Sequence, residues 1–459
     1  MTKLNESIFR EYDIRGIVET DLTDDAVEKI ASSFAAVYVR EGKKKISLGM
    51  DGRPSSANIK DIFIRTICSY GIDVIDIGLV PTPVLYYSVF KLGLGGGIII
   101  TASHNPSEYN GFKALLGKDA LSGAQIREIY EIARDEKFPE RVGGGNDETC
   151  DMVTDYIDHV SKDITLKKKI RVVVDSGNGT GGITGVPLFN KLGADVIDIF
   201  TEVDGSFPNH HPDPTKIENL QDLISKVKET GADLGIGFDG DADRIGVVDG
   251  NGNILWGDML MVLYSRDILK DHPGRKIISE VKASEVLYSE IEKNGGIPIM
   301  WKAGHSLIKK KIFEEDAILA GEVSGHIFFN DKWFGFDDAV YSGARLLELL
   351  SRSDSTLEEM VNTIPDTVNT PEIRVDTTEE AKFKIVNKVI EKFKEDYEVI
   401  DIDGARVKFP DGWALVRASN TQPSLVLRFE SDTEENLQKI RDIVEPILEK
   451  IVKEVESNT

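Results

Sequence analysis

The sequence Gly-Gly-Gly-Ile-Ile-Ile-Thr-Ala-Ser-His-Asn-Pro, residues 95–106, combines a strand pattern with reactive side chains at its end. A short β-branched run after glycines is typical of a buried strand. A hydroxyl at Ser103, an imidazole at His104 and an ammonium at Lys113 follow it, and the Asn-Pro pair favours a turn. This combination suits covalent catalysis on an anionic group, although a capping serine in an ordinary loop fits the stretch equally well.

A second strand-like run, residues 233–238, ends in Asp-Gly-Asp-Ala-Asp-Arg, residues 239–244. The carboxylates at alternating positions are Asp239, Asp241 and Asp243. Three carboxylates in one loop favour a hard cation, Mg²⁺ or Ca²⁺. An EF-hand is excluded, because Arg244 stands where that loop needs Gly and Gly250 where it needs Glu. A solvated acidic turn is the structural alternative, but the adjacent arginine favours a bridging phosphate.

One plan occurs three times along the chain: two strands flank a helix-length segment, and a third strand ends in a polar loop. The expected strands are residues 46–51, 71–77 and 95–100, then 171–175, 193–199 and 233–238, then 276–279, 296–300 and 317–320. Strand, helix and strand in this order predict crossover units in a largely parallel sheet. Ligands bind at the carboxyl ends of such strands, so the three polar loops are expected to share one cleft.

The pattern changes after a Pro-rich stretch, residues 364–371, which we interpret as a hinge. Beyond it we expect helices at 379–394 and 433–456 and strands at 397–402, 414–417 and 424–430, an α+β domain with an antiparallel sheet. A Gly-rich stretch at 141–148 predicts a linker, and a turn is expected at 249–253. The predicted domains are 1–147, 148–252, 253–366 and 367–459.

Composition narrows the function classes. The 459 residues include 55 Lys and Arg and 79 Asp and Glu, a net charge of −24, which disfavours nucleic acid and anionic membranes as partners. Two cysteines, Cys68 and Cys150, provide no disulfide framework. We find no apolar run of membrane-spanning length and no apolar signal core near Met1. The expected location is the cytoplasm.

Five motifs, in this order, resemble those of the α-D-phosphohexomutase superfamily, and specifically its phosphomannomutase/phosphoglucomutase branch. They are Phe-Arg-Glu-Tyr-Asp-Ile-Arg-Gly at 9–16, the serine stretch at 101–113, the acidic stretch at 239–244, Gly-Glu-Val-Ser-Gly-His at 321–326 and Arg-Ala-Ser-Asn-Thr-Gln-Pro at 417–423. The resemblance implies an α/β fold: three similar α/β domains with mixed, largely parallel sheets, plus a C-terminal α+β domain, around a central cleft.

The resemblance also implies an activity. A phosphoserine at residue 103 would exchange its phosphoryl group with a hexose phosphate through a hexose 1,6-bisphosphate, with Mg²⁺ bound by Ser103, Asp239, Asp241 and Asp243. The implied catalytic residues are Ser103, His104, Lys113, Arg15, Arg244 and His305, without a fixed choice of general acid or base. The implied substrate-binding residues are Tyr12, Lys282, Gly304, Glu322, Ser324, His326, Arg417, Ser419, Asn420 and Thr421.

Several alternatives stay open at this point. Val323 and Asn420 favour mannose and glucose phosphates over glucosamine phosphate, whose branch of the superfamily typically has Gln and Gly at these positions. The run Gly-Asn-Gly-Thr-Gly-Gly at 177–182, with Asp198 beyond it, formally matches a dinucleotide-binding fingerprint and would indicate an NAD-dependent oxidoreductase. A non-catalytic sugar-phosphate-binding protein would not need the acidic loop beside a reactive serine. The chain is expected to act as a monomer or homodimer on small sugar phosphates.

Overall fold

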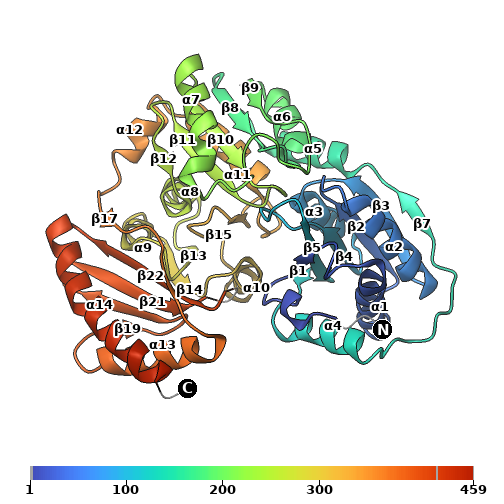
Figure 1. The fold of residues 1–459 in the computed structure, drawn as a ribbon. Coiled ribbons are helices and arrows are strands. Elements are labelled where there is room, and N and C mark those ends of the chain that lie inside the picture. The colour runs from blue at the N-terminus through green and yellow to red at the C-terminus, as the bar shows by residue number, and fades with distance from the viewer. Residues whose placement is uncertain (1–3, 420–421, 458–459) are drawn as a thin grey trace.

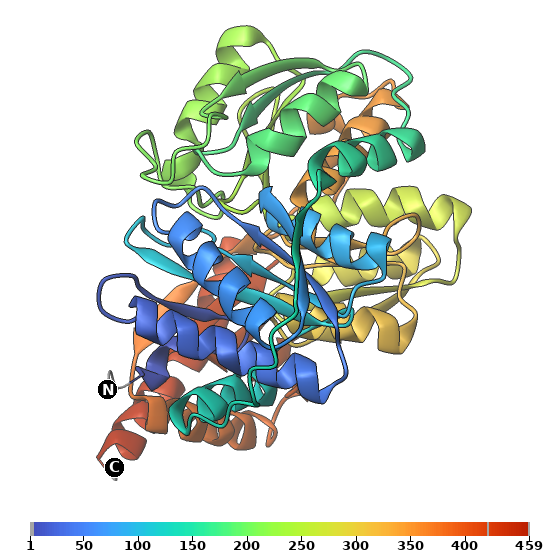
Figure 2. The same ribbon diagram turned by 90° about the vertical axis from the view of Figure 1, so that its right-hand side faces the viewer.

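The computed structural model describes residues 4–419 and 422–457, and each of its four domains has its own sheet. In Figure 1 the first domain is blue to teal on the right, the second green at the top, the third yellow in the middle and the fourth red at the lower left. Figure 2 shows the same chain from the side of the first domain. No helix in the described ranges is both long and apolar enough to cross a membrane.

The sheet of the first domain has the strand order β1-β5-β4-β2-β3-β7, with β6 paired to β5. Its central strands β4, β2 and β3 run parallel, while β5 is antiparallel to β4 and to β1. The elements are η1 (Glu6–Ile8), β1 (Ile14–Ile17), α1 (Asp24–Arg40), β2 (Lys45–Met50), α2 (Ser56–Ser69), β3 (Asp73–Leu79), α3 (Thr82–Leu92), β4 (Gly96–Ile100), β5 (Tyr109–Leu116), β6 (Asp119–Ala120), α4 (Ala124–Arg134) and β7 (Asp147–Thr149).

The second and third sheets are smaller versions of this plan. Their orders are β12-β11-β10-β8-β9 and β14-β13-β15-β16, with parallel central strands and antiparallel β11 and β16. The second domain contains α5 (Met152–Asp163), β8 (Arg171–Asp175), α6 (Gly181–Lys191), β9 (Asp195–Ile199), η2 (Ile217–Leu220), α7 (Gln221–Thr230), β10 (Leu234–Phe238), β11 (Ile245–Asp249) and β12 (Ile254–Leu255). The third contains α8 (Gly257–Asp271), β13 (Lys276–Glu280), α9 (Glu285–Lys293), β14 (Ile297–Trp301), α10 (His305–Glu315), β15 (Leu319–Gly321), β16 (Ile327–Phe329), α11 (Ala339–Ser351) and α12 (Leu357–Val361).

The fourth domain packs two helices against an entirely antiparallel sheet of order β17-β22-β21-β20-β19, with β18 also paired to β22. The elements are β17 (Val368–Asn369), β18 (Ile373–Asp376), α13 (Glu379–Phe393), β19 (Val399–Ile400), β20 (Ala405–Phe409), β21 (Gly412–Ala418), β22 (Ser424–Ser431) and α14 (Glu434–Glu456). The predicted fold class, including the antiparallel last domain, is therefore confirmed.

The polar loops occupy the same place in the first three domains. Each loop joins the last parallel strand to its antiparallel partner: β4 to β5, β10 to β11, and β15 to β16. The parallel strands are buried along most of their length, as their apolar runs predict. Because the loops follow the carboxyl ends of these strands, the sheets carry their polar side chains to one edge.

One local expectation differs from the structure, and another is confirmed. The end of the predicted linker at 141–148 enters β7, which pairs in parallel with β3 and exposes all its side chains. A strand without a buried face has no hydrophobic alternation, so its sequence does not reveal it. The expected turn at 249–253 joins β11 to β12, so the second sheet continues past residue 252.

Candidate active site

Ser103 lies in the loop between β4 and β5, where the first domain meets the second. Its side chain is 2% exposed, and its Oγ donates a hydrogen bond to Oδ2 of Asp239 over 2.7 Å. Nδ1 of His104 lies 3.1 Å from the same Oγ. The φ of Ser103 is +49°, which a residue with a side chain adopts only when its surroundings hold it there. The loop therefore directs a hydroxyl on a strained backbone toward the acidic loop.

The acidic loop between β10 and β11 brings three fully buried carboxylates together. Ligand atoms of Asp239, Asp241 and Asp243 lie within 4.8 Å of one another. Oδ1 of Asp241 and Oδ1 of Asp243 have no hydrogen-bond partner among the described residues. Burial, and then the charges of Asp243 and Asp241, raise the pKa of Asp239 well above its usual value. Unpartnered buried carboxylate oxygens are the ligands of a hard cation, so these residues fit the predicted Mg²⁺.

Lys113 reaches the acidic loop from β5. Its Nζ donates to Oδ2 of Asp241 over 2.6 Å and also contacts Oδ2 of Asp243. Burial by itself lowers the pKa of Lys113, but the two carboxylates outweigh burial, and the pKa lies above its usual value. The lysine therefore keeps its charge and neutralises part of the acidic loop.

Arg15 connects β1 to the serine loop. One guanidinium nitrogen donates to Oδ1 of Asn105 over 2.7 Å, and another lies 2.8 Å from Oδ2 of Asp13. Arg15 stands opposite Gly111 in the β1–β5 pair. A Cβ at Gly111 would lie 2.1 Å from the carbonyl oxygen of Ile14, so only glycine lets β1 come this close.

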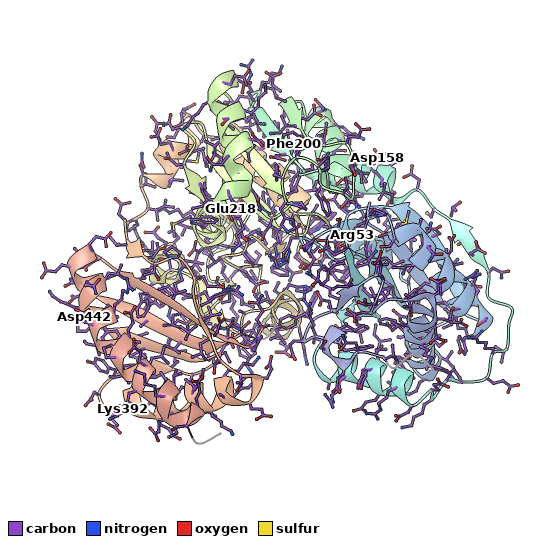
Figure 3. The ribbon with its side chains drawn as sticks, in the orientation of Figure 1. Arg53, Asp158, Phe200, Glu218, Lys392 and Asp442 are labelled. Carbon is purple, nitrogen blue, oxygen red and sulfur yellow. The ribbon has the colours of Figure 1, made fainter. Side chains whose placement is uncertain are left out.

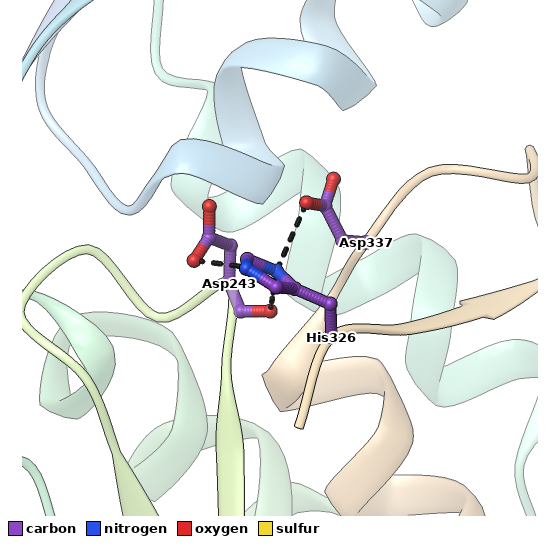
Figure 4. Close-up of side chains that lie close together, drawn as sticks. All are labelled: Asp243, His326 and Asp337. Atoms are coloured by element: carbon purple, nitrogen blue, oxygen red, sulfur yellow. Dashed lines mark hydrogen bonds and ion pairs between the residues drawn. The ribbon is translucent and has the colours of Figure 1, made fainter. Parts of the chain in front are cut away.

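His326, from the third domain, lies between two carboxylates (Figure 4). Its Nδ1 is 3.1 Å from Oδ2 of Asp337 and 3.6 Å from Oδ1 of Asp243, and Nε of Arg244 donates to its Nε2 over 2.9 Å. Because Nε2 accepts this bond, Nδ1 carries the proton that the carboxylates attract. The three side chains have the spacing of a metal site, but because the proton on Nδ1 faces the carboxylates, we interpret them as a hydrogen-bonded network.

Asp337 and Lys309 belong to this network, and the sequence analysis missed both. Nζ of Lys309 donates to Oδ1 of Asp337 over 2.7 Å, and Nδ1 of His305 lies 3.4 Å from Oδ2. The rings of His305 and His326 stack with their centroids 5.3 Å apart. One signal was present: Lys309 shares the buried face of α10 with His305 and Ile312 at helical spacing. A lysine on a buried helix face requires a partner.

The third domain's loop at 321–326 contacts the first domain through a tight backbone segment. Oε1 of Glu322 accepts a hydrogen bond from the backbone N–H of Gly304 over 2.8 Å, and the hydroxyl of Tyr12 donates to the carbonyl of Ala303 over 2.9 Å. Gly304 has a φ of +134°, and a Cβ there would lie 2.5 Å from the Tyr12 ring. Ser324 is half-buried in the same loop. Tyr12, Gly304 and Glu322 thus lie together in the structure.

Arg417 and Lys282 lie beside acidic partners of their own. A guanidinium nitrogen of Arg417 is 3.0 Å from Oδ2 of Asp403, which also accepts a bond from the backbone N–H of Ala303 over 3.0 Å. Nζ of Lys282 lies 3.7 Å from both Glu280 and Glu372. The fourth domain therefore contacts the third beside Gly304. Ser419, two residues after Arg417, is buried, and Asn420 and Thr421 lie outside the described residues.

The acidic loop packs directly against the glycine-rich run at 177–182. A Cβ at Gly179 would lie 2.7 Å from the carbonyl oxygen of Gly240, and Thr180 donates its backbone N–H to that oxygen over 3.0 Å. The carboxylate of Asp198 accepts a bond from Thr201 over 2.6 Å. The glycines thus allow close packing of two protein loops, which argues against a dinucleotide site.

His210 and His211 stand in a Pro-rich turn between Pro208 and Pro214. Nε2 of His210 lies 3.0 Å from Asp175, and its Nδ1 lies 3.0 Å from the carbonyl oxygen of His211. Neither histidine belongs to the metal-capable groups found in residues 4–419 and 422–457.

Comparison with known proteins agrees with this arrangement. Family models described as phosphoglucomutase/phosphomannomutase alpha/beta/alpha domains I, II and III match residues 6–140, 154–252 and 256–368, and the C-terminal domain model matches 372–447. A phosphomannomutase/phosphoglucomutase of Pseudomonas syringae pv. tomato is 45% identical over 455 residues, covering 99% of this chain and 97% of that protein. A phosphoglucomutase of Neisseria meningitidis serogroup A is 44% identical over 452 residues, covering 98% of each chain.

A solved structure supports the same assignment. The crystal structure of a phosphoglucomutase/phosphomannomutase family protein from Burkholderia thailandensis is 40% identical and superposes with a TM-score of 0.91 over 98% of each chain. This chain therefore belongs to the phosphoglucomutase/phosphomannomutase family.

Proposed function

We propose that the chain interconverts hexose 1-phosphates and hexose 6-phosphates through a phosphoserine at Ser103 and a hexose 1,6-bisphosphate. The observation that supports this most is the 2.7 Å contact between Oγ of Ser103 and Asp239 in a buried group of three carboxylates. Mg²⁺ held by Ser103, Asp239, Asp241 and Asp243 would neutralise phosphoryl oxygens and polarise phosphorus. The remaining chemistry belongs to the side chains around it.

In the proposed step, the free hydroxyl of the sugar phosphate attacks phosphorus, and the bond from phosphorus to Oγ of Ser103 breaks. The proton lost by the sugar hydroxyl is matched by the proton gained by Oγ. The 3.1 Å contact of His104 with Oγ supports a role for that histidine in proton transfer at serine. We propose His305 as a proton carrier on the sugar side. The sequence resemblance gave Lys113 the same role, but despite burial its carboxylate partners raise its pKa and keep it charged. We therefore propose Lys113, with Arg15, Arg244 and Lys282, as a cation that stabilises charge.

The bisphosphate must turn over before its second phosphate returns to Ser103, so the sugar must bind in two orientations. We propose that Glu322, Ser324 and His326 bind its hydroxyls, since they combine acceptor and donor groups. The docking residues proposed for the non-reacting phosphate are Arg417, Ser419, Asn420 and Thr421. Tyr12 and Gly304 support this binding surface through their contacts with residues 303 and 322.

Mannose and glucose phosphates are the proposed substrates. In the loop at 321–326, Val323 replaces only the apolar residue that is commoner in this branch. A relative at 45% identity is named for both activities. We further propose a cytoplasmic enzyme, because both cysteines of the chain are free. We propose that it acts as a monomer or homodimer.

Coupled assays of glucose 1-phosphate, mannose 1-phosphate and glucosamine 1-phosphate, each with Mg²⁺ and glucose 1,6-bisphosphate, test the proposed substrate class. We expect turnover of the first two, with kcat/KM for glucosamine 1-phosphate lower by about 10²-fold, because an ammonium replaces a neutral hydroxyl. Preference for glucosamine 1-phosphate would assign the chain to that alternative. Absence of turnover with all three would overturn the proposed function.

Arg417→Ala is expected to raise KM by about 10- to 100-fold, because a charge-assisted contact with the substrate phosphate is lost. The ratio of bisphosphate release or hydrolysis to mutase turnover should also rise, because a docked phosphate would hold the fourth domain over the site and exclude water. Steady-state kinetics and bisphosphate release measured together check both effects. Arg441→Ala on α14, which loses a pair with Glu445 and a contact with the ring of Phe429, is the control. If neither KM nor the ratio changes, Arg417 is not the phosphate dock.

A further inference from the structure

Arg53, three residues after β2, makes hydrogen bonds with every guanidinium nitrogen. Its Nε donates to Oδ2 of Asp51 over 3.0 Å. Its two terminal nitrogens donate to four backbone carbonyls of one loop, those of Ser103, Asn105, Pro106 and Tyr109, at 2.8, 2.6, 2.6 and 2.9 Å. The side chain is 1% exposed. A single buried cation thus collects the carbonyl groups of the serine loop.

The serine loop needs such a partner because of its shape. It leaves β4 and turns back into β5, so the carbonyls of Ser103, Asn105 and Pro106 lie outside the strand ladder, and that of Pro106 also accepts the backbone N–H of Tyr109 over 3.0 Å. Ser103 has a φ of +49°, and its carbonyl oxygen lies so close to Gly240 that a Cβ there would approach it to 2.3 Å. A planar fork with five N–H donors can satisfy several carbonyls at once, whereas a lysine ammonium is a point donor.

The second domain covers Arg53 from the other side. The ring centroid of Phe207 lies 5.2 Å from Cζ of Arg53, and a Cβ at Gly205 would lie 2.4 Å from the Arg53 Cα. Figure 3 labels Arg53 where the blue part of the chain approaches the green part. Oδ1 of Asp51 also accepts a bond from Ser56 over 2.7 Å, which fixes the partner of the guanidinium. Arg53 is therefore held on both sides.

We propose that Arg53 is a positioning residue for phosphoryl transfer: it holds the serine loop in the strained shape that directs Oγ of Ser103 at the acidic loop. This inference rests on the proposed role of Ser103. Arg53 acts only through the backbone of residues 103–109 and contacts none of the side chains proposed to bind sugar. Its loss is therefore expected to affect the reacting hydroxyl and to spare the affinity for substrate.

The test compares Arg53→Lys and Arg53→Gln with the wild-type enzyme. Arg53→Lys keeps the charge beside Asp51 but cannot reach four carbonyls, so it isolates the effect on the loop. We expect kcat to fall by about 10- to 100-fold in both variants, because misplacing a reacting group by about 1 Å usually has an effect of this size. We expect KM to stay within about threefold of wild type. Hydrogen exchange of peptides covering residues 101–113 should be at least about tenfold faster.

Arg345→Lys is the matched control. Arg345 on α11 is also buried and paired, with Asp331 at 2.8 Å and its Cζ 4.4 Å from the ring centroid of Phe329. Its variant should lose comparable stability but retain wild-type kcat and wild-type exchange in residues 101–113. A folded Arg53→Lys enzyme with wild-type kcat, with unchanged exchange in that stretch, or with a raised KM and an unchanged kcat overturns the inference.

The proposed function is judged separately, by the phosphate adduct at Ser103. If that adduct persists in Ser103→Ala, the proposed nucleophile is wrong, and the positioning role of Arg53 falls with it. If the adduct is lost in Ser103→Ala but Arg53→Lys behaves as wild type, only the inference about Arg53 is wrong. Should Arg53→Gln fail to fold, the lysine variant decides.

Discussion

Ser103→Ala is expected to carry no phosphate and to lose mutase turnover by about 10⁴-fold or more, since the substitution removes the proposed nucleophile itself. Oγ of Ser103 lies 2.7 Å from Asp239. The measurement is intact mass before and after incubation with glucose 1,6-bisphosphate and Mg²⁺, followed by steady-state kinetics. Wild-type protein should gain one phosphate adduct that maps to residues 101–113.

Ser107→Ala is the control for this experiment. Ser107 lies in the same loop beyond Pro106 and is half-buried, so its loss tests for any other hydroxyl in the stretch. We expect its adduct and its kcat to match those of wild type within about threefold. An adduct that persists in Ser103→Ala but disappears in Ser107→Ala would show that we chose the wrong serine.

Asp241→Asn is expected to lower kcat by about 10²- to 10³-fold at saturating Mg²⁺ and to weaken metal binding, because one of three anionic ligands is lost. Asp241 is fully buried, and its Oδ1 has no hydrogen-bond partner among the described residues. Chelator should abolish wild-type activity, and added Mg²⁺ should restore it. Calorimetric titration with Mg²⁺ measures the affinity independently of turnover.

Asp249→Asn tests whether the loss of any buried aspartate charge in this domain has the same effect, because Asp249 lies at the opposite end of the β10–β11 pair from the acidic loop. Asp249 ends β11 and is 2% exposed, but its Oδ1 accepts bonds from the backbone N–H groups of Asn251 and Asn253, both at 2.9 Å. An asparagine oxygen can accept the same bonds. We expect wild-type Mg²⁺ affinity in this variant. Equal Mg²⁺ affinity and kcat in Asp241→Asn and wild type would exclude the acidic loop as the metal site.

The sequence was sufficient to predict the parallel strands that lead into the site, but not the antiparallel strands β1, β5, β11 and β16 beside them. Buried parallel strands are continuous apolar runs, and the glycines and charged residues that follow them mark the loops. This is why β4, β10 and β15 could be recognised together with their polar loops. Strands whose side chains are exposed, such as β7, leave no such pattern, and their pairing depends on backbone hydrogen bonds with a distant segment.

The partners of the site residues depended on the tertiary structure. Arg53 meets carbonyls about 50 residues away, and Asp337 meets His326 and Lys309 on other elements. Burial, charge and periodicity describe a residue relative to its sequence neighbours, whereas these contacts arise only when separate sheets bring their loops to one place. The sequence by itself thus determined the parallel strands, the polar loops and the reactive side chains. Only the tertiary structure decided which buried charged groups contact these loops and side chains. A buried charge needs a partner, and that partner can come from a distant part of the sequence.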